Sequence, residues 1–188
     1  MVSWSSIVLG SSLVALAGCA AHAGLPSYAV VPDFTLTDQT GAAFESATKL
    51  NKNIWVADLI YTSCPGPCPR MSSQMHQVQT ALASIENVRL VSFTIDPKTD
   101  TPPVLKEYAS HFNAEPGRWF FLTGAEDKLQ HLSRDVFMLG DIGGNLEHST
   151  RFVLIDRQSR VRGYYLTSEA DAIPRLIEDA KKLSRERF

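Results

Sequence analysis

The 188-residue sequence predicts an α/β fold in which one mixed sheet is covered by helices on both faces. Three observations lead to this prediction. Apolar runs with the length of buried strands alternate with stretches of helical periodicity. Two late strands are joined by a short polar turn, as in a hairpin. Two cysteines stand at the corner between a buried strand and the helix that follows it.

The first half of the chain is expected to hold three strands and one helix. Residues 32–38 alternate in polarity and then reach Gln39-Thr40-Gly41, which is typical of a strand entering a turn. Residues 54–61 and 88–95 are apolar and indicate buried strands. Between them, residues 70–84 have apolar side chains at spacings of 4, 3 and 4, which predicts an amphipathic helix: Met71, Met75, Val78 and Leu82.

The second half continues the alternation. Pro102-Pro103 can open a helix over 103–112, because proline is tolerated in a first helical turn. A short strand over 119–122 and a helix over 125–138 follow. The late elements are a hairpin, 151–156 and 161–166, and a final helix, 169–184. Trp55 and Trp119 are expected in the core.

The cysteine motif lies in Cys64-Pro65-Gly66-Pro67-Cys68-Pro69, directly after the strand over 54–61. Backbone N–H groups and the helix dipole at such a corner favour a thiolate. In this pattern of elements the dithiol suggests a thioredoxin-like domain, with an additional strand or hairpin at its N-terminus. From the residues alone, the two sulfurs could form a structural disulfide, act as a redox pair or bind a soft metal ion.

The N-terminal region resembles a bacterial lipoprotein signal. No charged side chain precedes Asp33, residues 7–16 are apolar, and Leu16-Ala17-Gly18-Cys19 resembles a lipobox. We expect a signal peptide over 1–18, a tether over 19–31 and a domain over 32–188, with Cys19 carrying lipid. The chain departs from the usual signal by lacking an early Lys or Arg, and the alternatives are a plain signal peptide or uncleaved anchor, and a cytosolic start. Every interpretation except the cytosolic one places the domain outside the cytoplasm, on the periplasmic side, and lipid on Cys19 would hold it at a membrane.

The composition and the positions of the other candidate ligands exclude some partners and some metal ligands. A formal net charge of −2 argues against a nucleic-acid partner. Four histidines are expected to be tether or surface residues rather than ligands: His22, His76, His111 and His131. Met71 and Met75 are expected in the core rather than as thioether ligands. Asp96 and Asp100 flank a proline turn; turn formation and capping explain them, and a role near the metal or a partner is the alternative.

Four motifs in order resemble those of the SCO/SenC family of copper chaperones. They are the Cys-Pro-x-x-Cys-Pro element at 64–69, the segment Thr94 to Pro102, Trp119 with Leu122-Thr123-Gly124, and His148-Ser149 before the strand 152–156. The resemblance covers residues 30–185. The chain departs from the family pattern in having Glu147 before the histidine and a rigid Gly66-Pro67 pair, and neither change removes a ligand.

The resemblance implies that Cys64, Cys68 and His148 bind copper as Cu(I), Cu(II) or both, and thiolate and imidazole both suit copper. It also implies delivery to the binuclear copper centre of a cytochrome c oxidase subunit. Further partners would be another periplasmic copper chaperone or a thioredoxin-like reductant. Such a protein is more a metallochaperone than an enzyme.

Three other functions remain open. A thiol–disulfide oxidoreductase would use Cys64 and Cys68 without metal, to reduce oxidase cysteines before copper arrives. A peroxiredoxin-like or glutathione-peroxidase-like peroxidase fits less well, because the cysteines are paired. A zinc site is possible, but two cysteines and one histidine would leave one of four positions unfilled.

Overall fold

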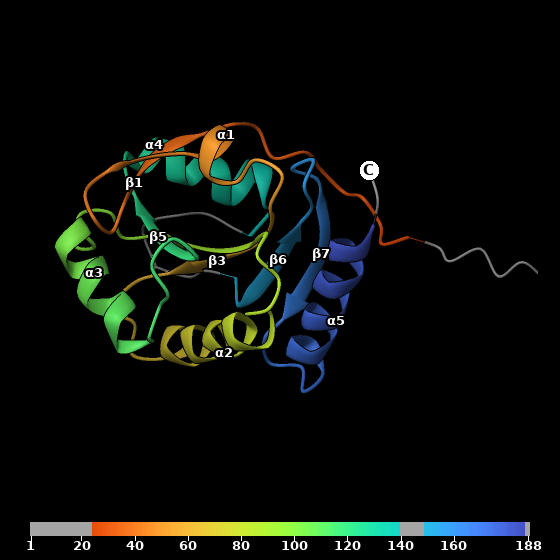
Figure 1. Cartoon of the computed structure of the whole chain (residues 1–188). Coiled ribbons are helices and arrows are strands. Elements are labelled where there is room, and N and C mark those ends of the chain that lie inside the picture. The colour runs from red at the N-terminus through yellow and green to blue at the C-terminus, as the bar shows by residue number, and fades with distance from the viewer. Residues whose placement is uncertain (1–23, 140–148, 187–188) are drawn as a thin grey trace, which may run out of the picture.

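The computed structural model describes residues 24–139 and 149–186. Seven strands form one sheet in the order β2-β1-β5-β4-β3-β6-β7 (Figure 1). The strands are β1 (Thr35–Asp38), β2 (Ala43–Glu45), β3 (Ile54–Ile60), β4 (Val88–Thr94), β5 (Trp119–Thr123), β6 (Arg151–Ile155) and β7 (Val161–Leu166). The helices are α1 (Ser46–Lys49), α2 (Pro67–Ala81), α3 (Pro102–His111), α4 (Glu126–Gln130), the π-helix η1 (His131–Val136) and α5 (Ala172–Arg185).

The sheet is mixed, as predicted. β3, β4 and β5 are parallel and form its centre. β6 runs antiparallel to β3, and β7 runs antiparallel to β6. The β1–β2 hairpin adds to the other edge, antiparallel to β5. A mixed sheet with this N-terminal hairpin confirms the predicted thioredoxin-like class.

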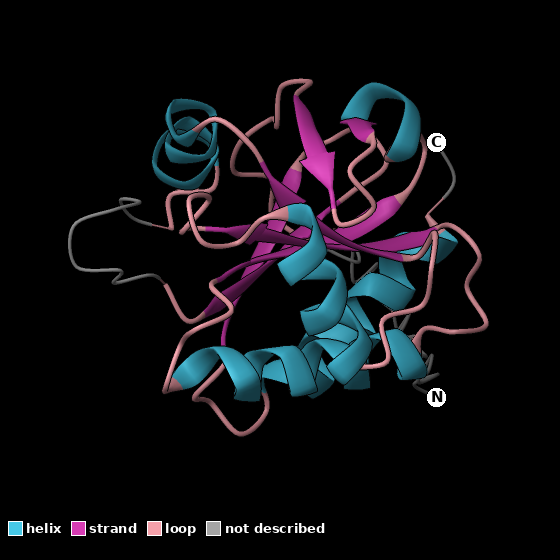
Figure 2. Ribbon diagram, turned by 90° about the vertical axis from the view of Figure 1, so that its left-hand side faces the viewer, coloured by secondary structure: helices cyan, strands magenta, loops and turns pink. Residues whose placement is uncertain are grey.

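Helices cover both faces of the sheet (Figure 2). Side chains of α2, α3 and α5 pack in one apolar cluster with one face of the strands. Side chains of α4 and η1 pack in a second cluster on the other face. All seven residues of β3 are buried, because this strand is central and has helices on both sides. Its side chains alternate between clusters, so Val56 lies in the first and Trp55 in the second.

Three details differ from the sequence prediction. Helix α2 begins at Pro67, three residues before the apolar periodicity shows it, because prolines occupy its first turn. The sequence analysis assigned no element to residues 42–53, where the structure has the three-residue strand β2 and the four-residue helix α1. The helix expected over 125–138 divides into α4 and the π-helical η1.

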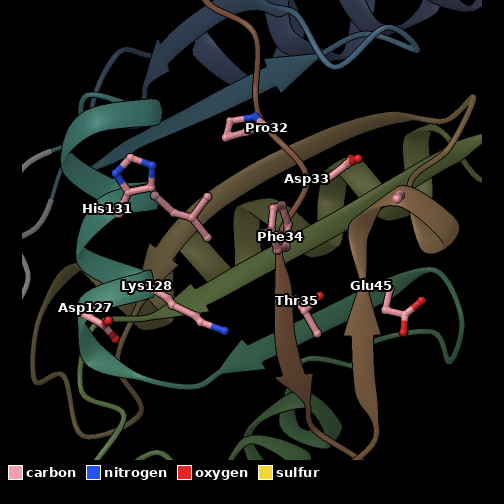
Figure 3. Close-up of a pocket in the computed structure, with 10 residues that line it drawn as sticks. Pro32, Asp33, Phe34, Thr35, Glu45, Asp127, Lys128 and His131 are labelled. Atoms are coloured by element: carbon pink, nitrogen blue, oxygen red, sulfur yellow. The ribbon is translucent and has the colours of Figure 1, made fainter.

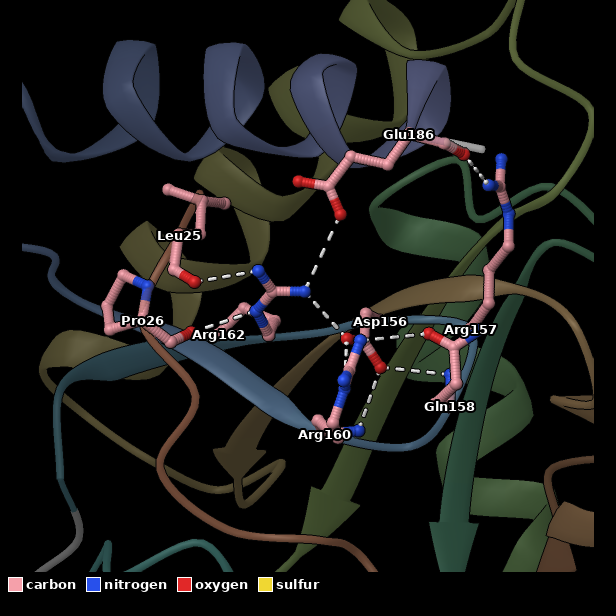
Figure 4. A network of polar contacts seen from close by, with 8 residues as sticks. All are labelled: Leu25, Pro26, Asp156, Arg157, Gln158, Arg160, Arg162 and Glu186. Atoms are coloured by element: carbon pink, nitrogen blue, oxygen red, sulfur yellow. Dashed lines mark hydrogen bonds and ion pairs between the residues drawn. The ribbon is translucent and has the colours of Figure 1, made fainter. Parts of the chain in front are cut away.

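The segment 25–31, expected as part of a tether, lies along β7. The backbone N–H of Tyr28 donates to Val161 O at 3.0 Å, and that of Val31 donates to Ser159 O at 2.7 Å. The Arg162 guanidinium donates to the carbonyl oxygens of Leu25 and Pro26 at 2.7 and 2.8 Å (Figure 4).

The same guanidinium pairs with the buried Asp156 at 2.8 Å and with Glu186, just beyond α5, at 3.6 Å. This network therefore joins the N-terminal segment, the β6–β7 turn and the end of α5 (Figure 4).

Candidate functional site

The two cysteines of the motif lie together where β3 gives way to α2, as predicted. No disulfide joins them, and both are buried. Cys64 follows a turn in which its backbone N–H donates to Tyr61 O at 3.2 Å. Cys68 lies in the first turn of α2 and belongs to the same apolar cluster as Met71 and Met75. The sulfur-bearing corner is therefore built from a loop arm, which carries Cys64, and a helical arm, which carries Cys68.

The prolines suit this corner. Pro67 is the first residue of α2, and Pro69 also lies in the first turn. The first N–H groups of a helix have no partner within it, so proline sacrifices no hydrogen bond there. Its fixed φ also restricts the unfolded chain, which lowers the entropy lost on ordering the corner.

The two thiols differ in acidity. Burial alone would raise the pKa of Cys64, but hydrogen bonds from the Cys68 thiol, the backbone N–H groups of Cys68 and Gly66, and the Tyr61 hydroxyl outweigh it and lower this pKa. Burial, and then the hydrogen bond to Cys64, raise the pKa of Cys68. The pair therefore favours a thiolate at Cys64 and a protonated thiol at Cys68. Such a thiolate is suited both to nucleophilic attack and to binding a soft metal.

His148 and Glu147 lie outside the described residues, and so does the lipobox cysteine, Cys19. Their roles stay predictions. The chain after His148 can be followed from Ser149, whose N–H donates to Leu139 O at 3.2 Å. It then enters β6, which pairs Val153 with Ala57 of β3 in antiparallel register. The start of β6 consequently lies beside the end of β3, which is the end that leads to the dithiol.

The described histidines, His76, His111 and His131, do not join the cysteines. His131 pairs with Asp135 at 2.9 Å on the surface of η1, and His111 ends α3, as expected. Over residues 24–139 and 149–186, no group of three or more His, Cys, Asp and Glu side chains is placed to hold a metal ion. Met71 and Met75 are fully buried, which confirms their assignment to the core.

Two buried carboxyl groups lie near the dithiol, and one of them, Asp58, was not recognised from the sequence. Asp58 is fully buried on β3, and burial raises its pKa from 3.8 to about 7, against the opposing effect of the Ser92 hydroxyl. Neither carboxyl oxygen has a hydrogen-bond partner in the described part of the chain. Asp100, expected first as a turn residue and otherwise near the metal or a partner, is fully buried and accepts hydrogen bonds from Thr62 and Thr94. The signal for Asp58 is its position as the single charge within an otherwise apolar strand.

A separate hollow of about 590 Å³ lies between residues 32–35 and the helical segment that carries Lys128 and His131 (Figure 3). Phe34 lines it, and Asp33 and Glu45 line it from the side of the first strands (Figure 3). No cysteine lines this hollow, so it is distinct from the dithiol corner. In the described residues, no helix is both long and apolar enough to cross a membrane.

Comparison with known proteins identifies relatives of the whole domain. The family model described as SCO1/SenC matches residues 23–185. A crystal structure of a SCO1/SenC family lipoprotein from Bacillus anthracis is 30% identical, with a TM-score of 0.76, and the match covers 83% of this chain and 95% of that one.

Two further solved structures share the fold. BsSco, described as a member of the Sco family of cytochrome c oxidase assembly proteins and as containing a disulfide switch, is 28% identical with a TM-score of 0.76. That match covers 87% of this chain and 97% of BsSco. ScoI of Bradyrhizobium japonicum, solved with copper bound, is 23% identical with a TM-score of 0.68, over 82% of this chain and 99% of ScoI.

Proposed function

The chain belongs to the SCO1/SenC family, and from this premise we propose that it is a metallochaperone that carries copper outside the cytoplasm. Its cargo would be bound by the Cys64 and Cys68 thiolates and the His148 imidazole. The acceptor would be the subunit of cytochrome c oxidase that holds the binuclear copper centre. Lipid on Cys19 would keep the protein at the membrane, near that acceptor, and so raise the effective concentration.

The observation that carries the proposal is the pair of buried thiols, not joined by a disulfide, at one corner of the fold. Cu(I) prefers thiolate ligands, and the lowered pKa of Cys64 makes one thiolate available without metal. Cys68 would lose its proton on binding copper, since a metal-bound thiol is deprotonated. Copper would then pass to the acceptor by ligand exchange, with the acceptor's cysteines replacing the three ligands in turn.

A second function is favoured by the unequal acidity of the two thiols. A Cys64 thiolate can attack a partner's disulfide to form a mixed disulfide, and the Cys68 sulfur can then displace the partner. The products are a Cys64–Cys68 disulfide and a reduced partner dithiol. Two electrons pass from this chain to the partner; one proton comes from the Cys68 thiol, and because Cys64 reacts as a thiolate the second proton comes from water. The disulfide switch described for BsSco supports considering this reaction here.

A copper titration of the purified domain tests the proposal. His148→Ala should weaken copper binding by about tenfold or more, because it removes one of three ligands. His131→Ala is the matched control, since His131 is on the surface and pairs with Asp135. Cys64→Ser and Cys68→Ser should each abolish Cu(I) binding. In the parent, Cu(II) should give a thiolate-to-copper charge-transfer band.

The outcomes separate the two functions. If His148→Ala binds copper as tightly as His131→Ala, the proposed ligand set is wrong. If the parent gives no copper band but exchanges disulfides rapidly, the oxidoreductase function is favoured. For the anchor, Cys19→Ser should move the expressed protein out of the detergent-extracted membrane fraction, and retention there would contradict lipidation.

A further inference from the structure

A fully buried carboxylate links the loop arm of the dithiol to the neighbouring strand. Asp100 lies between β4 and α3 and is 0% exposed. Its Oδ1 accepts from the Thr62 hydroxyl at 2.5 Å, and its Oδ2 accepts from the Thr94 hydroxyl at 2.5 Å. The backbone N–H of Thr62 lies 3.3 Å from Oδ1 and 3.2 Å from Oδ2. Both oxygens are therefore held from two sides by donors on two different segments.

The Asp100 carboxylate has no ion pair with any cationic side chain of the described residues. It depends on neutral donors alone, and hydrogen bonds to a charged acceptor are short and directional. Burying a charge costs free energy unless such hydrogen bonds satisfy it. Conformations of the loop in which Thr62 donates to the carboxylate are therefore strongly favoured.

Thr62 stands two residues before Cys64, whose backbone N–H donates to Tyr61 O and whose sulfur accepts hydrogen bonds from Tyr61, Gly66 and Cys68. Both cysteines belong to the same apolar cluster, but Cys68 lies in the first turn of α2 whereas Cys64 lies in the loop before that helix. The position of the Cys64 sulfur relative to the Cys68 sulfur thus depends on how firmly the loop arm is held.

We propose that Asp100 is a positioning residue for Cys64: by fixing Thr62, it holds the Cys64 sulfur at the distance from Cys68 that copper binding and disulfide closure both need. The part of this inference that concerns copper binding rests on the proposed function. It assigns to Asp100 a role beyond forming the turn after β4. Groups that orient ligands in this way affect metal affinity without touching the metal.

Two isosteric substitutions on opposite sides of the same carboxylate make the test. Thr62→Val removes the hydroxyl bond on the Cys64 side, and Thr94→Val removes the matching bond on the β4 side. Thr94 also accepts from the Asp96 N–H at 2.9 Å, so Thr94→Val is expected to reduce folding stability at least as much as Thr62→Val. Asp100→Asn, which keeps the side-chain volume, is the third variant. Unfolding in urea first establishes that each variant folds.

Copper affinity is then measured by competition with a chromophoric Cu(I) chelator. Thr62→Val and Asp100→Asn should weaken binding about tenfold, whereas Thr94→Val should stay within about twofold of the parent. If Thr94→Val weakens copper binding as much as Thr62→Val does, the network serves stability alone and the inference is overturned.

A metal-free measurement keeps the two proposals distinguishable. The protein dithiol is equilibrated with oxidised dithiothreitol, so that one S–S bond forms in the protein as one breaks in the reagent and two protons pass to the reagent's thiols. Thr62→Val and Asp100→Asn should shift this equilibrium and Thr94→Val should not. If this pattern appears while the parent binds no copper, Asp100 positions the dithiol and the copper function fails. If all three variants match the parent, the positioning role fails.

Discussion

The buried Asp58 carboxyl makes folding stability depend on pH in a direction opposite to that of most carboxyl groups. Burial raises its pKa from 3.8 to about 7. Asp58→Asn removes the titrating group and keeps the side-chain volume. We expect the parent to lose about 2.5 kcal/mol of unfolding free energy between pH 5 and pH 8 through this group, and the variant to lack that loss.

The sign follows from the protons bound in each state. Below the unfolded pKa of 3.8, both states hold the proton and stability does not depend on this group. Between this value and the folded pKa, the folded state keeps the proton while the unfolded state has lost it. Stability therefore falls as pH rises, by up to about 1.4 kcal/mol per pH unit. Above the folded pKa of about 7, both states are ionised and the slope vanishes.

Urea unfolding at half-unit steps from pH 5 to pH 8 measures this effect. Both proteins should carry Cys64→Ser and Cys68→Ser, so that thiol titration near pH 8 does not contribute. The difference between the two stability curves should grow steadily up to about pH 7 and then level off. Parallel curves across the whole range would refute the reasoning, because they would show that Asp58 has the same proton affinity folded and unfolded.

Three other substitutions and one labelling experiment test separate parts of the structure. At neutral pH, a limiting amount of iodoacetamide should label Cys64 faster than Cys68, because only Cys64 has a lowered pKa; peptide mass spectrometry reads the ratio, and equal labelling would contradict the assignment. Met75→Ala should lower the unfolding free energy by about 2–5 kcal/mol in urea, since the side chain is fully buried, and a loss under about 1 kcal/mol would argue against this packing. Gly41→Ala should cost about 1 kcal/mol in the same assay, because φ is +84° there and nothing crowds the new methyl group; an unchanged stability would mean that the turn adapts. Arg162→Met should speed protease cleavage within residues 24–31, because the Arg162 guanidinium binds two carbonyl groups of this segment. Unchanged cleavage would show that the backbone hydrogen bonds to β7 and the turn before it hold the segment without Arg162.

Much of the sheet could be predicted because its strands have strong local signals. β3 and β4 are apolar along almost their whole length, and β6 and β7 are separated by a polar turn. The spacing of Met71 and Met75 identified α2 and its buried face. β2 and α1 have three and four residues, so neither is long enough to show a period.

The site was predictable where its residues are adjacent in sequence and less so where the fold brings them together. Cys64 and Cys68 are four residues apart, and their shared corner follows from the strand and helix on either side. Thr62 and Asp100 are 38 residues apart and meet because β3 and β4 are parallel neighbours with Ile60 beside Thr94. A turn motif alone does not indicate that its carboxylate reaches across to another strand. The burial of Asp58 likewise follows from the helices that cover β3.

The Arg162 network also fixes the side of the domain from which the N-terminal segment, with its proposed lipid anchor, leaves. It fastens Leu25 and Pro26 beside the β6–β7 turn and the last turn of α5. Ile155, at that turn, pairs with Trp55 near the start of β3, whereas the sulfur atoms follow its far end. A bilayer holding the proposed lipid would therefore lie on the side of the β6–β7 turn, and the dithiol corner would lie on the side away from the bilayer. The copper acceptor would therefore have to present its cysteines from a domain outside the membrane. Their distance from the bilayer would have to be one that the chain before residue 24 can span.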